Sequence, residues 1–490
     1  MAVPTDTEAM TPQARAARAR QLRKNVGGSV AILAIGLVLY FLPVPAGVDP
    51  RGMHMLGIFV ATILFLILQP LPTAAVAIIG LTVAMVTGTM APGTEAFTGF
   101  GSSSIWLIIA AFFIAQGFVK TGLGRRIALL FLSWLGNSSL GVSYGLAATD
   151  LVLAPATPSN TARLGGILFP VITSISEVAD STPASEPSRK RLGAFLTATA
   201  NNVNAVTSAM FMTAMAGGPV AVALAADQDI NISWGTWALA GLVPGIIALI
   251  LVPLICYRLV PPTLKKMPGG SESARNELHQ LGAMKRGEVI MLVTFIAMLL
   301  LWSLGSLIHI NSTTVAFLGV SVLLLTRVLA WGDLAANKGA WNTLMFFAIL
   351  VGMAGQLNTL GVIKWLGDTI AGVVGDLPWV WVLIILSAVY MVLHYLFASE
   401  LAQIVALYAL FVSVMVGAGV PAMVAALMLG AISALMGAMT HYASGPAALI
   451  FGSGYLKTSE FFRAGAVVAV VTLIIWILAA LSWWQVIGLV

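Results

Sequence analysis

Apolar segments long enough to cross a lipid bilayer recur along this sequence. They begin near residues 29, 52, 73, 103, 193, 235, 288, 312, 341, 379, 421 and 464, and a helix of about 20 apolar residues spans about 30 Å of hydrocarbon. Only 9% of the residues are charged, whereas about a quarter are charged in soluble domains. We therefore predict an all-α polytopic membrane protein, in which not every apolar segment needs to span.

The basic residues favour one threading of these segments. We expect re-entrant hairpins near residues 145–175 and 385–415, which leaves about eleven transmembrane helices. With a cytoplasmic N-terminus, this threading places every lysine and arginine except Arg51, Lys364 and Arg163 on the cytoplasmic side, as the positive-inside rule requires. The C-terminus is then external. The net charge of +6 needs no nucleic-acid partner, and we predict an integral protein of a bacterial inner membrane.

The chain divides into four parts in this interpretation. Residues 1–28 form a basic cytoplasmic tail, which is retained because the apolar run after it lacks a small-residue cleavage site. Residues 29–258 form the first transmembrane half and residues 288–490 the second. Between them, residues 259–287 form a cytoplasmic linker rich in Pro, Gly and polar residues. The basic residues of the tail are Arg15, Arg18, Arg20, Arg23 and Lys24.

The two halves carry similar polar interruptions. Ser159 matches Ser399 at an offset of 240 residues, and the same shift carries Asn201 onto His441. Each half therefore contains a hairpin tip and, about 40 to 50 residues later, a polar break in a helix. Because an odd number of crossings separates corresponding elements, we expect the second copy to be inverted relative to the first.

The first tip, Pro155–Arg163, is a polar and helix-breaking segment inside an apolar run. Irregular backbone at membrane depth is tolerated only where it lines a cavity or is buried in protein, and paired interruptions are typical of a transporter's substrate site. The second half-helix would begin at Ser159, Asn160 and Thr161, where free N–H groups and the helix dipole favour an anion. These residues could instead form only an N-cap. Arg163 could pair with a bound carboxylate or act as a fixed charge that holds the tip.

We expect a broken helix opposite each tip. The second break would fall at Ser444, Gly445 and Pro446, and the first at Thr207 and Ser208. The alternative for the first is a packed Ser/Gly helix interface, which is common in membranes.

Ionisable residues inside a membrane are candidates for function. His394 and His441 could donate to a substrate carboxylate or to Glu400, although a lone buried histidine is more often structural. Asp150 could cap or anchor the first leg of its hairpin. We expect no cofactor or metal, because the only cysteine, Cys256, lies in an apolar run.

At these positions the chain resembles the divalent anion:sodium symporter family, and specifically its dicarboxylate and tricarboxylate exchangers of the 2-oxoglutarate/malate and citrate/succinate type. The resemblance covers nearly the whole chain after about residue 30. The motifs that carry it are Gln69–Thr73, Lys120–Ile127, Asp150–Arg163, Thr207–Ala216, His394–Ser399, Thr440–Pro446 and Phe451–Tyr455.

The resemblance implies a fold of eleven transmembrane helices and two re-entrant hairpins. It also implies a substrate bound between the two hairpin tips, a scaffold domain that forms a homodimer, and a transport domain that moves as an elevator. By the same resemblance, Ser159, Asn160 and Thr161 contact a substrate carboxylate.

The second tip departs from the family pattern. It keeps Ser399 but has Glu400 and Leu401, where sodium-coupled members have Asn and Thr. Leucine cannot ligate sodium, so the pattern favours exchange without sodium. Arg163 would replace the first sodium. Gln403, at the position equivalent to Arg163, is uncharged, so the replacement for the second sodium is either missing or supplied by His394 or His441.

Glu400 is the clearest anomaly of the site. An ionised carboxylate close to a dianionic substrate would repel it by several kcal/mol at a low effective dielectric. We expect Glu400 to be protonated, paired with a histidine, or turned away from the substrate.

Three functions are consistent with the sequence. The first is antiport of di- or tricarboxylates such as malate, succinate, 2-oxoglutarate, tartrate or citrate. The second is symport of a dicarboxylate with sodium or with a proton carried by Glu400. The third is an intramembrane hydrolase that uses Ser159 or Ser444 with His394 or His441. Against it count the missing His-Glu-x-x-His motif and the fact that neither serine stands in a Gly-x-Ser-x-Gly nucleophile turn.

Overall fold

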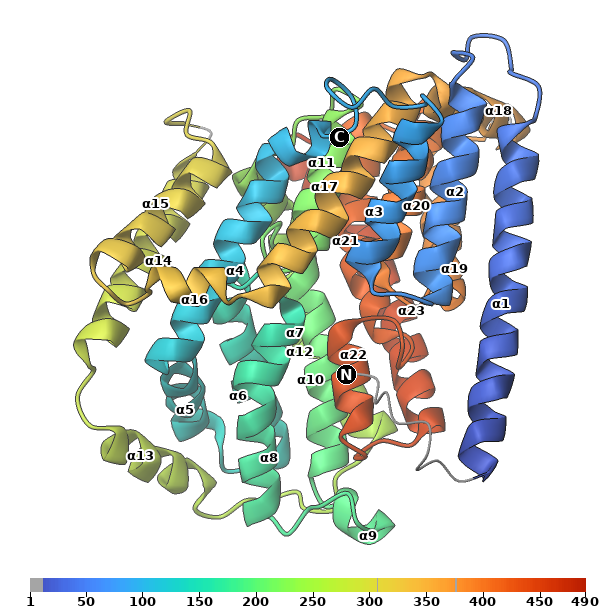
Figure 1. Cartoon of the computed structure of the whole chain (residues 1–490). Helices are drawn as coiled ribbons and strands as arrows, with labels where there is room; N and C mark the ends of the chain where they lie inside the picture. Colours follow the sequence, from blue (N-terminus) through green and yellow to red (C-terminus); the bar gives the residue numbers. More distant parts are fainter. Residues whose placement is uncertain (1–11, 306, 375–376) are drawn as a thin grey trace.

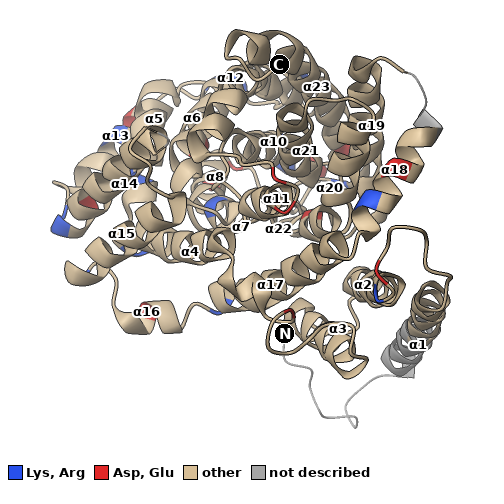
Figure 2. Ribbon diagram, turned by 90° about the horizontal axis from the view of Figure 1, so that it is seen from above, with Lys and Arg blue, Asp and Glu red and all other residues tan. Residues whose placement is uncertain are grey.

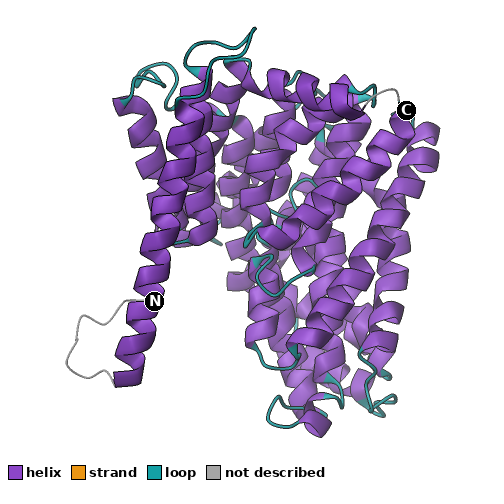
Figure 3. Ribbon diagram, turned by 90° about the vertical axis from the view of Figure 1, so that its right-hand side faces the viewer, coloured by secondary structure: helices purple, strands orange, loops and turns teal. Residues whose placement is uncertain are grey.

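A computed structural model describes residues 12–305, 307–374 and 377–490 of the chain, and these residues form helices joined by loops, with no strand (Figure 3). The basic cluster Arg15–Lys24 lies outside the residues whose side chains are described. The first half contains α1 (Pro12–Tyr40), α2 (Gly52–Leu68), α3 (Thr73–Val86), α4 (Ser103–Thr121), α5 (Leu123–Leu135), α6 (Ser139–Leu153), α7 (Asn160–Arg163), α8 (Phe169–Val178), α9 (Glu186–Arg189), α10 (Gly193–Met210), α11 (Gly217–Ala226) and α12 (Trp234–Leu259).

The second half repeats much of this order. It follows the linker helix α13 (Gly270–Leu281) and contains α14 (Arg286–Leu304), α15 (Ser312–Leu325), α16 (Trp331–Ala335), α17 (Lys338–Thr359), α18 (Val362–Val374), α19 (Trp379–Leu393), α20 (Glu400–Gly417), α21 (Ala422–Leu435), α22 (Gly445–Gly452) and α23 (Thr458–Val486). Gly122 and Gly361, which precede α5 and α18, both have a left-handed φ, of 79° and 81°. The same backbone turn therefore ends corresponding helices of the two halves, where glycine avoids the steric cost of a Cβ atom.

The chain is an integral membrane protein by the length and apolar character of its helices. Among the described residues, 7 helical segments are long and apolar enough to span a bilayer. They are Ser103–Thr121, Trp234–Leu259, Arg286–Leu304, Lys338–Thr359, Trp379–Leu396, Glu400–Gly417 and Thr458–Val486, and α2, α3, α11, α15 and the α21 region are shorter apolar helices.

Two helical hairpins approach the middle of the molecule from opposite ends (Figure 1). In hairpin 1, α6 ends at Leu153 and the chain resumes as α7 at Asn160, which runs through a π-helical turn, Leu164–Leu168, into α8. In hairpin 2, α19 ends at Leu393 and α20 begins at Glu400, and the two helices pack against each other. Both helical hairpins include the residues 145–175 and 385–415 at which hairpins are predicted, and their re-entrant character stays a prediction.

Each half also contains a broken helix, but the first break lies later than predicted. Thr207 and Ser208 are helical residues inside α10, and the irregular segment is 211–216, before α11 begins at Gly217. The second break, 439–444, precedes Gly445 of α22. The two second half-helices thus begin 228 positions apart, so the predicted equivalence of Asn201 with His441 is wrong. The connection after the second hairpin is shorter than that after the first.

The centre of the bundle is α10, in which every residue is buried. It packs against α6, α12, α21 and α22. Seen from above, α7, α10, α11 and α22 lie within a ring of the other helices, and α1 stands at the edge (Figure 2). Polar residues placed on α10 must therefore find partners inside the protein.

Ion pairs join the two halves at one end of the bundle. Arg189 of α9 pairs with Glu460 of α23 at 2.6 Å. Lys457 and Lys190 both contact the Glu186 carboxylate, at 2.6 and 2.8 Å. Hydrogen bonds from Lys190 and Lys457 lower the pKa of Glu186 to about 2. The base of hairpin 1 is thereby tied to the start of the last helix.

The linker contains a helix that its composition did not suggest. The polar segment 259–287 was predicted only as a connection, yet α13 forms within it and packs along α5. Ser271 and Ala274 of α13 are buried, whereas Glu272 and Arg275 are exposed. The buried or half-buried residues Ser271, Ala274, Glu277, Leu278 and Leu281 lie on one face, which suffices to hold an amphipathic helix against a neighbour.

Candidate functional site

The tips of the two hairpins touch each other at the centre of the molecule. The Asn160 side-chain amide donates to Oε1 of Glu400 at 3.0 Å, across 240 residues of sequence. The backbone N–H of Glu400 donates to Ala443 O at 2.8 Å, so the break before α22 joins the same cluster. The structure therefore brings both tips and the second broken helix to one place.

Three predicted serines cap the helices that begin at this cluster. Ser159 Oγ accepts from Ala162 N at 3.1 Å, and Ser444 Oγ accepts from Ala447 N at 3.3 Å. The cap by Ser399 on Ala402 N is longer, at 3.5 Å. The cap that the sequence raised as an alternative for the first tip is thus present at Ser159, and Ser399 and Ser444 cap their helices in the same way. Ser444 Oγ also donates to Gly437 O at 2.6 Å, whereas the caps of Ser159 and Ser399 do not use the hydroxyl hydrogens.

Glycines allow the close approach of these elements. A Cβ atom at Gly445 would overlap the Thr161 hydroxyl, and one at Gly437 would overlap Oε2 of Glu400. Thr161 and Ser444 remain partly exposed, as do Ser159, Asn160 and Ser399. Polar groups at the meeting point can therefore still contact a small ligand.

Arg163 is fully buried and makes five contacts around its guanidinium. Its Nε donates to Asp150 Oδ1 at 2.7 Å, and both side chains are 0% exposed. Its Nη1 donates to the carbonyls of Thr157, at 2.9 Å, and Ala214, at 2.7 Å. These bonds tie the first tip to leg α6 and to the break after α10. Arg163 thus has the geometry of a fixed charge that holds the tip, and not that of a partner for a bound carboxylate.

Thr207 and Ser208 lie on this guanidinium rather than at the tip. The Nη2 group donates to Thr207 Oγ1 at 3.2 Å and to Ser208 Oγ at 3.0 Å, and Thr207 also donates to Asp150. Asn204 completes the network with a 3.3 Å bond to each Asp150 oxygen. A direct contact between Thr207 or Ser208 and a ligand stays a prediction.

The second half has an uncharged network at the equivalent place. Gln403, 240 positions after Arg163, donates from Nε2 to Tyr390 O at 2.7 Å. Its Oε1 accepts from Nδ1 of His394 at 2.8 Å. Tyr390 is in turn 240 positions after Asp150. The two hairpins are therefore braced in the same way, by an ion pair in one and by neutral hydrogen bonds in the other.

Neither histidine pairs with Glu400, which removes one of the three alternatives for that residue. His394 faces Gln403, and its Nε2 has no hydrogen-bond partner among the described residues. His441 lies among aromatic rings, 4.4 Å from the Phe451 ring and 5.7 Å from that of Phe462. Glu400 is 5% exposed and has Asn160 as its side-chain partner. The alternative in which Glu400 pairs with a histidine does not hold in this conformation, because the histidines are held elsewhere.

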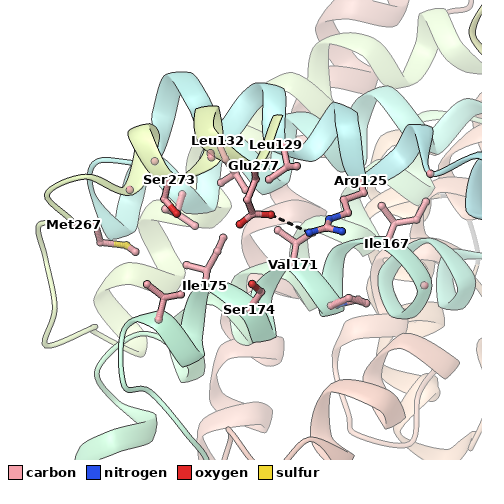
Figure 4. Close-up of a pocket in the computed structure, with 18 of the residues that line it drawn as sticks. Arg125, Leu129, Leu132, Ile167, Val171, Ser174, Ile175, Met267, Ser273 and Glu277 are labelled. Atoms are coloured by element: carbon pink, nitrogen blue, oxygen red, sulfur yellow. Dashed lines mark hydrogen bonds and ion pairs between the residues drawn. The ribbon is translucent and has the colours of Figure 1, made fainter. Parts of the chain in front are cut away.

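A cavity beside hairpin 1 lies away from the hairpin tips. A cavity of about 270 Å³ opens between α5, α8 and α13 and is lined mainly by apolar side chains (Figure 4). An ion pair between Arg125 and Glu277, at 3.0 Å, crosses it (Figure 4). It belongs to the contact of the linker helix with hairpin 1 and contains none of the predicted site residues.

Sequence reasoning left open whether Asp150 only caps or anchors the first leg of its hairpin, and it missed Asn204 and the Ala214 carbonyl. A signal was present, because Asp150 and Arg163 stand symmetrically about the tip and are the only ionisable residues of hairpin 1 inside its apolar legs. Carboxylates and guanidinium groups in lipid must be paired, so each was the natural partner of the other.

Proteins of known sequence and structure resemble this chain over almost its whole length. Residues 23–490 match the family described as the sodium:sulfate symporter transmembrane region. The chain is 44% identical over 458 residues to the putative malate transporter YflS of Bacillus subtilis (strain 168), covering 93% of this chain and 95% of that protein. It is also 44% identical over 462 residues to the chloroplastic dicarboxylate transporter 2.1 of Arabidopsis thaliana, covering 93% and 82%.

Two further similarities extend the comparison. The inner membrane protein YbhI of Escherichia coli (strain K12) is 36% identical over 474 residues, covering 94% of this chain and 98% of that protein. The crystal structure of the YdaH transporter of Alcanivorax borkumensis superposes with a TM-score of 0.54 at 14% sequence identity, covering 96% and 98%. At that identity the superposition shows the fold alone.

Proposed function

Because this chain belongs to the sodium:sulfate symporter family, also called the divalent anion:sodium symporters, and is a transporter and not an enzyme, we propose that it exchanges one di- or tricarboxylate anion for another. The relatives named for malate and dicarboxylate transport support this substrate class. Candidate substrates are malate, succinate, 2-oxoglutarate, tartrate and citrate.

The observation that carries the proposal is the contact of the two hairpin tips. Helices α20 and α22 begin there, as does α7 with its continuation, so several N–H groups of first helical turns point toward one cluster. Helix starts and hydroxyl or amide donors bind anions without a charged side chain. We assign Ser159, Asn160 and Thr161 to one substrate carboxylate, and Ser399, Glu400, Ser444, Gly445 and Pro446 to the other end of the substrate.

Arg163 acts indirectly in this scheme. Asp150 already balances its charge at 2.7 Å, so the guanidinium braces the first tip and does not attract the substrate as a free cation. Its Nη groups satisfy two carbonyls and two hydroxyls. Carbonyl and hydroxyl oxygens are the ligands of hard cations, so Arg163 occupies the place where an oxygen-lined cation site would form. We assign positioning roles to Thr207, Ser208 and Asp150 for the same reason.

Exchange requires that the empty carrier reorient poorly. The tips lack a surplus positive charge, so water must hydrate the unpaired N–H groups when the carrier is empty. When a dianion binds, its charge pairs with these N–H groups, and both are removed from water together. A mobile unit of the two hairpins with α10–α12 and α21–α23 would carry the substrate as an elevator. The remaining helices would form a scaffold and the contact of a homodimer.

We also propose the predicted topology for the whole chain. Eleven crossings would be made by α1, α2, α3, α4, the α10–α11 pair, α12, α14, α15, α17, the α21–α22 pair and α23. The end that carries α9 and α13 would be cytoplasmic and the end that carries the C-terminus external (Figure 1). The similarity to a bacterial inner membrane protein supports that membrane as the location.

Reconstitution in liposomes tests the proposal directly. Purified protein in liposomes loaded with malate, succinate, 2-oxoglutarate, tartrate, citrate or no substrate should take up labelled dicarboxylate only when a substrate is present inside. Uptake into empty liposomes driven by a cation gradient would overturn exchange and favour symport.

We predict that uptake does not depend on sodium. Arg163 fills the oxygen-lined place in the first half, and in the second Leu401 offers no ligand while Gln403 is bonded to Tyr390 and His394. Uptake into substrate-loaded liposomes should agree within about twofold between sodium and choline buffers. A steep rise with sodium concentration would contradict the prediction and remove Arg163 from this role.

Proton-coupled symport is the second candidate, and Glu400 is the observation that favours it. This carboxyl group is buried at the tips, and its one side-chain partner is an amide donor, not a cation. An ionised carboxylate in such a place is costly beside a dianion, whereas the neutral acid can donate a hydrogen bond.

We predict that Glu400→Gln stays active and flattens the dependence of uptake on pH. Glutamine keeps an oxygen that can accept from Asn160 and cannot ionise. Dianion uptake by the wild type should fall as pH rises, and Glu400→Gln should not share that fall. Glu288→Gln, which alters a carboxylate bonded to Arg126 away from the tips, is the control. A fully active Glu400→Gln with an unchanged profile would mean that Glu400 does not titrate during transport.

A further inference from the structure

A charged hollow lies far from the hairpin tips, where α14 begins and α15 ends. We call it the α14–α15 hollow. It measures about 500 Å³, and its lining includes Arg286 and Gly287 of α14 together with Thr326 and Arg327 after α15. The two helices pack side by side at the edge of the molecule (Figures 1 and 2). Arg286, Leu325 and Arg327 are exposed, so the hollow lies at the surface of the molecule.

The two arginines of the hollow are left without acidic partners, whereas three basic residues of α4 and α5 have them. Lys120 pairs with Asp333 at 2.5 Å, Arg125 with Glu277 at 3.0 Å, and Arg126 with Glu288 at 2.6 Å. Within the part of the chain that the structure describes, neither Arg286 nor Arg327 forms an ion pair. Two uncompensated guanidinium groups facing one space match an anion, and guanidinium geometry suits phosphate.

The backbone at Arg327 supports a role for its side chain. Arg327 follows the end of α15 with a φ of 60°, in the left-handed region where a helix usually ends on glycine. Glycine would relieve the strain at this position, yet the chain has arginine there.

Apolar surface continues from the hollow along both helices. Ile290, Leu325 and Val328 line the hollow itself, and Leu325 is 84% exposed. Beyond it, exposed side chains recur at helical spacing on both helices, namely Val289, Val293, Ile296 and Leu300 of α14 and Val322 and Leu318 of α15. A charged hollow at the end of an apolar stripe fits a phospholipid, with its phosphate head group in the hollow and its acyl chains along the stripe.

We propose that the α14–α15 hollow binds an anionic phospholipid, with Arg286 and Arg327 on its phosphate. The hollow lies at the end of α14 that follows the linker, the face predicted to be cytoplasmic, where anionic lipids attract basic residues close to the membrane. The exposed Trp331 at the start of α16 lies near it in sequence, and tryptophan is enriched at the head-group level of membranes. A free phosphate would use the arginines but leave the apolar stripe unused.

Native mass spectrometry of the full-length protein in detergent tests this site. Phosphatidylglycerol or phosphatidylcholine is added at equal concentrations, and the bound lipid is counted. The wild type should retain phosphatidylglycerol preferentially. The affinity of Arg286→Gln/Arg327→Gln for this lipid should be lower by a factor of about ten or more. The matched control, Arg125→Gln/Lys190→Gln, removes two paired basic residues of the same end and should keep the preference.

Three outcomes would overturn the proposal. The first is equal lipid retention by the double variant and the wild type, at melting temperatures within a few degrees in the same detergent. The second is full displacement of phosphatidylglycerol by inorganic phosphate in the wild type, which would make the hollow a phosphate site. The third is loss of a dimer in the double variant with unchanged lipid retention, which would assign the hollow to a contact between protomers.

Discussion

Asn160→Ala is expected to abolish carboxylate uptake by the reconstituted protein. Asn160 is the side chain that connects the two tips, through its 3.0 Å bond to Glu400, and its own Oδ1 accepts from Thr161 N at 2.9 Å. One hydrogen bond to a charged ligand contributes about 1.5–3 kcal/mol, or about 10- to 100-fold in affinity. Loss of that bond together with the link between tips should reduce uptake below detection at low substrate concentration.

The measurement is uptake of labelled dicarboxylate into liposomes that contain the same amount of wild-type or variant protein. Asn337→Ala is the matched control, because Asn337 caps α17 through Ala340 N at 3.0 Å and lies outside the tip cluster. It should keep uptake within about twofold of wild type, since a lost cap costs about 1 kcal/mol of stability and no ligand contact. Asn160→Ala with uptake near that of the control would remove the first tip from the substrate site.

The hairpins could be predicted from the sequence because lipid leaves few options for polar backbone. Pro155, Pro158 and the Ser-Asn-Thr run interrupt an apolar segment, and such an interruption must be buried or line a cavity. A match to Ser399 located the second tip. Both predicted tips are found in contact, through Asn160 and Glu400.

The partners inside the site were harder to predict because they depend on how helices rotate against each other. Thr207 and Ser208 are polar residues in an apolar run, a pattern shared by a broken helix and by a buried helix that bonds to a neighbour. The structure has the second arrangement, with both hydroxyls on Arg163. The break itself falls in Phe211–Ala216, where Met and Ala residues give no sequence signal for irregular backbone.

The offset of the repeat could also not be extended beyond the hairpins. It is set by matched helices as far as Ser159 and Ser399, but the loops that follow are free to differ in length. Segment 179–192 carries α9 and its ion pairs, whereas segment 418–421 is a short turn between α20 and α21. A single shift therefore misaligned Asn201 with His441.

Asp150→Asn and Arg163→Gln are each expected to be strongly destabilised and inactive. Either change leaves one ionised group in a place that is 0% exposed, and breaking a buried ion pair costs about 3–5 kcal/mol. Both variants should lose thermal stability in detergent, measured by the fraction that stays monodisperse after heating. Wild-type stability of either variant would show that the pair does not hold the first tip.

The double variant Asp150→Asn/Arg163→Gln separates the charge of the pair from its geometry. It places a neutral amide pair where the second hairpin already uses Gln403 with His394 and Tyr390, so it should recover most of the lost stability. The control is Arg189→Gln/Glu460→Gln, which removes a pair at 2.6 Å at the end of the bundle.

Transport should distinguish the two pairs even where stability does not. Arg189 and Glu460 join helices far from the tips, so their double variant should keep uptake in proportion to folded protein. Asp150 and Arg163 fix Thr157, Ala214, Thr207 and Ser208 around one guanidinium, and a glutamine has too few donors to hold all four. A stable Asp150→Asn/Arg163→Gln protein with impaired uptake would mean that Arg163 positions the first tip for the substrate, whereas full uptake would reduce the ion pair to a stabilising contact.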